Sequence, residues 1–177
     1  MQAAAATPSE IPVSSARNVS SVQDLCDLEH PELVQLYKHG TPPDFAALSG
    51  DLRGRMLAAP ALPEFITRPA RAFARTDYFP WRGKSFRQLG DDHGEGINRI
   101  FVDALKLFRF ETRVTPSRHD GKPAVELNYD LPENPFFIRA IEDEIREVRP
   151  GLYLGQAWLR LGLARHFVLW FGLERSE

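Results

Sequence analysis

Residues 134–174 read NPFFIRAIEDEIREVRPGLYLGQAWLRLGLARHFVLWFGLE, and this stretch decides the fold. Its first part, 134–148, has the pattern of a helix. Asn134 is a good capping residue, Pro135 suits the first helical turn, and apolar residues recur every three or four positions. A Pro-Gly pair then ends the pattern. The sequence therefore predicts an amphipathic helix over 134–148, with its charged side chains on the solvent face.

After this segment the apolar period changes from 3.6 residues to 2. Segments 152–161 and 167–173 predict two strands, joined by a turn near 162–165. Both strands are apolar on both faces, so each side of the hairpin must be covered by another part of the chain. The predicted helix 134–148, which directly precedes the hairpin, is the expected cover for one side.

The rest of the chain predicts further antiparallel strands. Asp-Gly at 120–121 is a strong hairpin signal between two alternating segments. The expected strands are 48–57, 78–86, 97–102, 107–115 and 124–131, and the expected upstream helices are 22–28, 31–40 and 64–75. Together they indicate an α+β fold, mainly an antiparallel sheet that forms a closed or nearly closed small barrel, because closure removes exposed strand edges. The alternative is a helix packed across a strongly curved open sheet.

Length and composition indicate a single domain over 21–177, preceded by a disordered leader over 1–20. The net charge of −2 gives no general attraction to nucleic acid. The single cysteine, Cys26, favours a reducing compartment. The leader lacks the pattern of a signal peptide, and no apolar stretch is long enough to span a membrane. A soluble, cytoplasmic protein is therefore expected.

Four residues are candidates for general acid–base catalysis: Tyr129, Asp130, Glu144 and His166. A carboxyl group against apolar surroundings would have a raised pKa, and a tyrosine beside it could donate a hydrogen bond. Each residue also has a plain structural interpretation. Asp130 can cap a turn, Tyr129 can fill the core, Glu144 can belong to the charged face of a helix, and His166 can be a hydrogen-bonded residue at a strand end.

A second set of residues suits a ligand-binding cavity. Lys84 or Arg99, if it points inward, would anchor the carboxylate of an amphiphilic ligand. The candidate lining consists of Trp81, Lys84, Asn98, Arg99, Phe108, Phe110, Tyr153, Gln156, Trp158 and Trp170. No histidine or cysteine pair has metal-ligand spacing, and no nucleotide-binding motif occurs, so neither a metal nor a cofactor is predicted.

The segments WRGKSF (81–86), INR (97–99), NYD (128–130) and EDEIREVRPGLYLG (142–155) resemble a family of small bacterial proteins with no assigned activity. That family is similar to the calycin or lipocalin-like barrels, which bind lipids and other small apolar molecules. The resemblance covers about 48–174 and implies a ligand-binding barrel. It assigns no catalytic residue, and the Gly-x-Trp signature of true lipocalins is replaced here by Trp-Arg-Gly at 81–83.

Three functions follow as hypotheses. The first is a protein that encloses a small hydrophobic or amphiphilic ligand in a barrel cavity. The second is a cofactor-independent isomerase, cyclase or lyase that uses acid–base residues in the same cavity. The third is a partner-binding protein with a filled barrel and an exposed apolar patch on residues 22–40. A homodimer is a further hypothesis, for the assembly of the protein.

Overall fold

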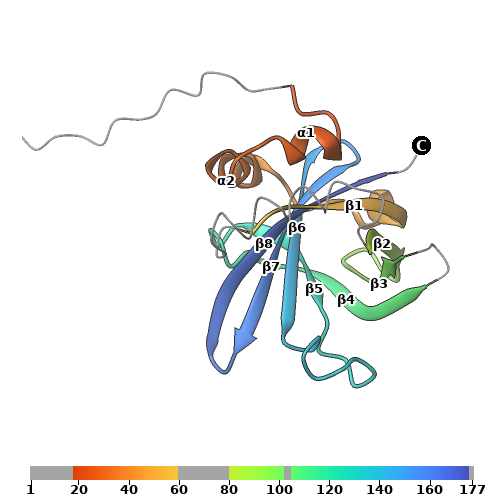
Figure 1. Ribbon diagram of the computed structural model, residues 1–177. Helices are drawn as coiled ribbons and strands as arrows, with labels where there is room; N and C mark the ends of the chain where they lie inside the picture. Colours follow the sequence, from red (N-terminus) through yellow and green to blue (C-terminus); the bar gives the residue numbers. More distant parts are fainter. Residues whose placement is uncertain (1–17, 60–79, 102–104, 176–177) are drawn as a thin grey trace, which may run out of the picture.

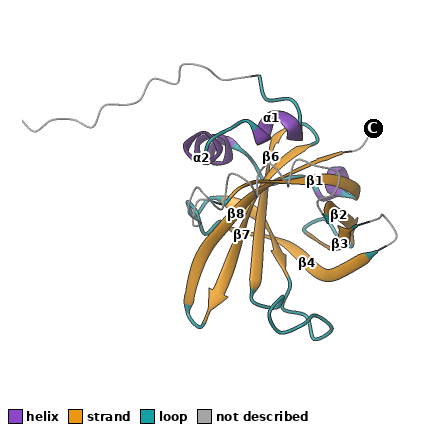
Figure 2. Ribbon diagram, viewed as in Figure 1, coloured by secondary structure: helices purple, strands orange, loops and turns teal. Residues whose placement is uncertain are grey.

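The computed structural model describes residues 18–59, 80–101 and 105–175. Within these residues, three short helices precede the sheet and eight strands form it (Figures 1 and 2). The helices are α1 (Val22–Cys26), α2 (His30–His39) and α3 (Phe45–Leu48). The strands are β1 (Gly50–Ala58), β2 (Trp81–Gln88), β3 (His93–Ile100), β4 (Lys106–Pro116), β5 (Pro123–Asn128), β6 (Ile141–Arg149), β7 (Leu152–Leu161) and β8 (Ala164–Arg175).

The sheet is a closed antiparallel barrel in which each strand pairs with the next and β8 returns to pair with β1. The closing seam runs from Leu52 opposite Arg175 to Ala58 opposite Trp170. The predicted class and the predicted closure are therefore confirmed. The alternative, an open curved sheet under a helix, does not occur in the described part of the chain.

The inner core fills one end of the barrel. Phe45 and Leu48 of α3 are buried with inward side chains from the strands, including Leu127 and Tyr153. The Tyr153 hydroxyl donates a hydrogen bond to the carbonyl of Ala47 at 3.4 Å. Because α3 directly precedes β1, this short helix covers the end of the barrel at which β1 begins.

A second apolar layer lies outside the barrel, where α1 packs on β1 and β8 and α2 packs on β6 and β7 (Figure 1). Leu25 of α1 and Leu33 of α2 are fully buried against Leu154 and Trp170. The approach of α1 is close, since a Cβ atom on Gly172 would lie 2.9 Å from Leu25. The last hairpin is apolar on two faces because one face lines the barrel and the other contacts the N-terminal helices.

The predicted helix over 134–148 is wrong. Turns occupy most of 132–140, and 141–149 is the central strand β6. This strand pairs with β5 on one side and β7 on the other, so its backbone groups gain two ladders of hydrogen bonds. A helix would have left those strands with open edges, and pairs of charges four residues apart on a helix contribute only about 0.2–0.5 kcal/mol each.

The charged residues of this segment also have partners that a helix would not give them. Glu142 pairs with Arg165, and the fully buried Arg146 pairs with Asp120. Arg139, on the preceding loop, pairs with Asp130. The side chains that resembled a solvated helical face therefore join β6 to neighbouring loops and strands.

Two expectations lie outside the described residues. They are the helix over 64–75 and almost all of the leader over 1–20. The helices expected at 22–28 and 31–40 correspond to α1 and α2.

Three glycines make room for aromatic rings inside the barrel. A Cβ atom on Gly155 would lie 2.2 Å from the ring of Phe171, and one on Gly96 would lie 2.4 Å from Phe110. In both cases the glycine and the ring are direct partners on adjacent strands. A Cβ atom on Gly54 would lie 2.5 Å from a ring atom of Trp81 on β2. These glycines allow large rings to lie flat against the barrel wall.

We expect Gly155→Ala to lower the free energy of unfolding by about 1–3 kcal/mol, because the added methyl group would overpack a core that has no space beside Phe171. Chemical denaturation measures this change. In a Phe171→Leu background the same substitution should cost much less, since the ring that it meets is gone. Equal costs in the two backgrounds would contradict this packing.

Candidate functional site

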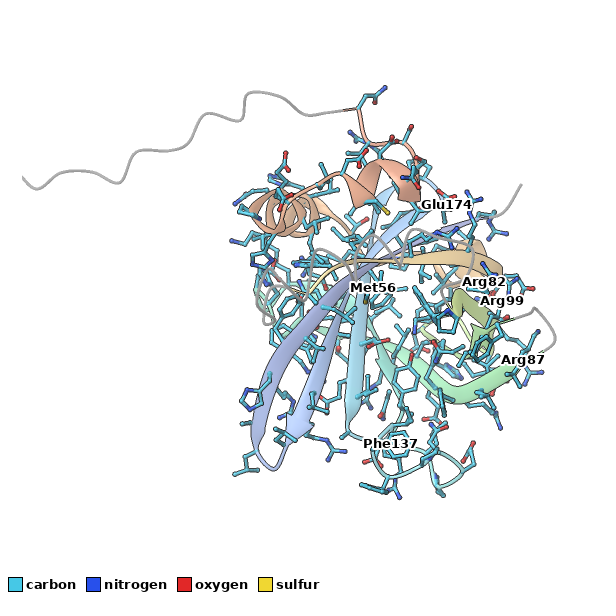
Figure 3. The ribbon with its side chains drawn as sticks, viewed as in Figure 1. Met56, Arg82, Arg87, Arg99, Phe137 and Glu174 are labelled. Atoms are coloured by element: carbon cyan, nitrogen blue, oxygen red, sulfur yellow. The ribbon has the colours of Figure 1, made fainter. Side chains whose placement is uncertain are left out.

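A partly open cavity of about 300 Å³ lies in the barrel at the end opposite α3. Its walls are mostly apolar, and its polar groups gather in one corner. The apolar lining comprises Met56, Trp81, Ile100, Phe108, Ile138, Ile141, Ala157, Leu169 and Phe171, and the polar corner comprises Lys84, Asn98, Tyr129 and Asp143. Met56 lies within the barrel wall, whereas Phe137 lies on the loop between β5 and β6 (Figure 3).

Lys84 of β2 is the centre of the polar corner, and its side chain is only 3% exposed. Its Nζ atom donates hydrogen bonds to Asn98 Oδ1 at 2.9 Å, to the Tyr129 hydroxyl at 2.5 Å and to Asp143 Oδ2 at 3.0 Å. An ammonium group has three N–H donors, so these acceptors use all of them. Burial lowers the pKa of Lys84 because the ammonium loses its hydration, and the Asp143 carboxylate opposes this shift.

Four aromatic rings surround the same ammonium. The Nζ atom lies 5.1–5.4 Å from the ring centroids of Trp81, Phe110, Tyr129 and Phe171. Such distances allow cation–π attraction, which is stronger where water is excluded. Three of these rings are the ones that lie over glycines, so the small residues of the barrel wall make this cage possible.

Asn98 is held in one orientation by a distortion of β4. The register shifts between Ile97 and Asn98, which leaves Phe108 as an extra residue with a φ of 61°. The Phe108 carbonyl accepts a hydrogen bond from Asn98 Nδ2 at 3.2 Å, while Asn98 Oδ1 accepts one from the Trp81 indole at 3.0 Å. A left-handed phenylalanine costs roughly 1–3 kcal/mol, and here that strained residue lies at the cavity.

Tyr129 and Asp143 complete the corner. The phenol donates a hydrogen bond to Asp143 Oδ2 at 3.0 Å and accepts one from Asn98 Nδ2 at 3.2 Å. Burial, with the nearby Asp143 carboxylate, raises the pKa of Tyr129 well above its usual value. The phenol therefore keeps its proton at neutral pH. Asp143 Oδ1 is buried and has no hydrogen-bond partner among the described residues.

Five of the residues singled out in the sequence meet at this cavity: Trp81, Lys84, Asn98, Phe108 and Tyr129. Phe110 borders the same ammonium from the inner core. Tyr153 also belongs to the inner core, but at the α3 end, where it contacts Ala47.

The other expected site residues lie elsewhere. Arg99 is on the outer side of β3, 4.0 Å from Asp51 (Figure 3). Trp170 donates to His30 Nδ1 under α2, and Gln156 and Trp158 are on the same outer side of β7. Of the proposed acid–base residues, Asp130 is exposed and paired with Arg139, Glu144 is buried outside the barrel against Ser117, and His166 is exposed.

Asp143 is the important residue that the sequence interpretation missed as a site residue. The helical interpretation of 134–148 assigned it to a solvated face, whereas in β6 it alternates with Glu142 and Glu144 and points inward between Ile141 and Ile145. The signal was that Asp143 lies two residues from each of the β-branched residues Ile141 and Ile145, because a period of two residues is that of a strand.

The structure offers no sign of a metal centre in the part of the chain that it describes, since no group of three or more His, Cys, Asp or Glu side chains converges there. Among the same residues, no helix has the length and apolarity required to cross a membrane.

Comparison with known proteins supports the fold. No protein-family model matches the sequence, and no curated protein matches it. A crystal structure of a protein from Thermomonospora curvata is similar, with a TM-score of 0.52 and 18% sequence identity over 85% of this chain and 89% of that chain. At this identity, the likeness shows the fold alone.

The Lys84–Asp143 pair should behave as a coupled unit. We expect Lys84→Met or Asp143→Leu alone to lower the free energy of unfolding by about 3–5 kcal/mol, because each leaves one buried charge without its partner. The double variant should be far more stable than the sum of the two losses predicts. Denaturation of the four proteins in a double-mutant cycle tests this coupling, and additive losses would contradict it.

Proposed function

We propose that this protein binds a small, largely apolar molecule inside its barrel. The observation that carries the proposal is the cavity of about 300 Å³, whose apolar walls end in a single polar corner. Small-molecule sites commonly combine such walls with a few polar groups that fix the orientation of the ligand. The resemblance to calycin-like barrels supports the same function, as does a closed barrel whose described residues form a packed core at the α3 end and a cavity at the other.

The polar corner is suited to orient a ligand, because few of its hydrogen-bonding groups are free to bind water. Nearly all its donors and acceptors are already bonded to one another, and rings surround its charge. A rigid, satisfied network presents a fixed surface to whatever enters the cavity. We propose that this surface, together with the walls from Ile100, Ile141 and Leu169, selects the ligand.

A cofactor-independent isomerase, cyclase or lyase is the alternative, and it requires two titratable side chains that converge in the cavity. Lys84, Tyr129 and Asp143 do converge there, but they are hydrogen-bonded to one another, and of the four acid–base residues expected from the sequence only Tyr129 lines the cavity. The partner-binding hypothesis required an exposed apolar patch on residues 22–40. Instead, Val22, Leu25, Leu33 and Tyr37 are buried against the barrel. Ligand binding is therefore the function that we favour, in the cytoplasm that the lone buried Cys26 suggests.

Titration with cyclohexane tests the binding function, because this probe has no polar group. We expect the methyl NMR resonances of Ile100, Ile141 and Leu169 to shift on addition, while those of Leu152 and Leu154 in the helix-covered outer layer stay unchanged. Ala157→Phe should abolish the shifts, because the new ring fills the cavity.

Val114→Phe is the matched control. It adds a ring of similar size to an exposed position of β4, outside the residues that line the cavity, and should leave cyclohexane binding unchanged. Cavity methyl resonances that do not respond to cyclohexane, or that respond equally in Ala157→Phe, would refute the proposed function. If the cavity resonances shift as expected, native mass spectrometry of protein purified from its own host would identify the natural ligand.

A further inference from the structure

Among the described residues, the polar corner of the cavity has one hydrogen-bonding atom without a partner. All three donors of Lys84 have acceptors, Asn98 bonds through both its oxygen and its nitrogen, and the Tyr129 hydroxyl both donates and accepts. Within the described residues, the exception is Asp143 Oδ1, which is buried without a partner. Because an unpaired buried acceptor is costly, this atom requires a donor from outside the cluster.

We propose that the ligand carries a neutral hydrogen-bond donor, a hydroxyl group, that binds Asp143 Oδ1. This inference rests on the proposed binding function and specifies the chemical class of the ligand as a small apolar alcohol or phenol. The hydroxyl would donate a hydrogen bond to this oxygen, while the hydrocarbon part contacts the apolar walls.

The same geometry argues against a carboxylate ligand. An anchoring role for Lys84 would require a free N–H donor, but its three donors are bonded to Asn98, Tyr129 and Asp143. A ligand carboxylate would therefore bring a second negative charge toward Asp143 with no donor to receive it. Its burial would be costly, because an isolated anion loses its hydration in an apolar cavity.

A cationic amine is also disfavoured. It could donate to Asp143 Oδ1, but Lys84 already neutralises this carboxylate through Oδ2 at 3.0 Å. Two cations around one carboxylate would leave a net positive charge buried among apolar side chains. A hydroxyl group satisfies the oxygen without changing the charge of the cluster.

Four probes that share one ring separate these possibilities: cyclohexane, cyclohexanol, cyclohexanecarboxylate and cyclohexylamine. At neutral pH, cyclohexanol should bind at least about tenfold more tightly than the carboxylate or the amine, since each charged probe buries an uncompensated charge. Cyclohexanol should also move the side-chain carboxyl carbon resonance of Asp143, whereas cyclohexane should move only the methyl resonances of the walls.

The carboxyl carbon of Glu142 is the internal control. It belongs to the neighbouring residue of β6 but faces outward, where it pairs with Arg165, and should respond to none of the probes. Cyclohexane binding combined with an unmoved Asp143 resonance, or with equal affinity for the carboxylate, would overturn the hydroxyl assignment and leave the binding function intact. Absence of binding by all four probes would instead refute the binding function itself.

Discussion

The burial of Lys84 inside a closed barrel is the constraint on which the site depends. A lysine ammonium without water or a counter-ion is expensive to bury, so its surroundings must supply both acceptors and negative charge. They come from three separate segments: Asn98 on β3, Tyr129 directly after β5 and Asp143 on β6. A shift of one residue in any of these strands would turn its inward residue outward and break the cluster. The buried charge thereby couples the site to the register of the barrel.

The packing around the charge follows from small residues at particular positions. Gly54, Gly96 and Gly155 allow Trp81, Phe110 and Phe171 to lie against the barrel wall. These rings exclude water from the ammonium and provide its cation–π contacts. The side chains at the cavity end are arranged differently, and they leave space between Met56, Ile141 and Leu169. One barrel therefore contains both a tightly packed core and a hollow with a polar corner.

The sequence predicted those features that depend on local chemistry. The Asp-Gly turn at 120–121, the alternation in β4 and β5 and the two-faced apolarity of β7 and β8 all correspond to the structure. The segment 134–148 was misread because helical and strand periods both fit its short apolar pattern. Only the pairing of this segment with β5 and β7 distinguishes the two periods, and that pairing cannot be read from the segment itself. Asp143 was missed for the same reason, because its partner Lys84 is 59 residues away.

The hydrogen exchange and chemical shifts of the Lys84 side chain test the buried site most directly. Side-chain NMR at neutral pH should show an ammonium with slow hydrogen exchange, because its three donors are bonded and water is excluded. The adjacent methylene protons should be shifted strongly by the four surrounding rings, relative to those of the exposed Lys106 and Lys122. Exchange and shifts like those of the two exposed lysines would contradict the buried, caged charge on which the proposed site is built.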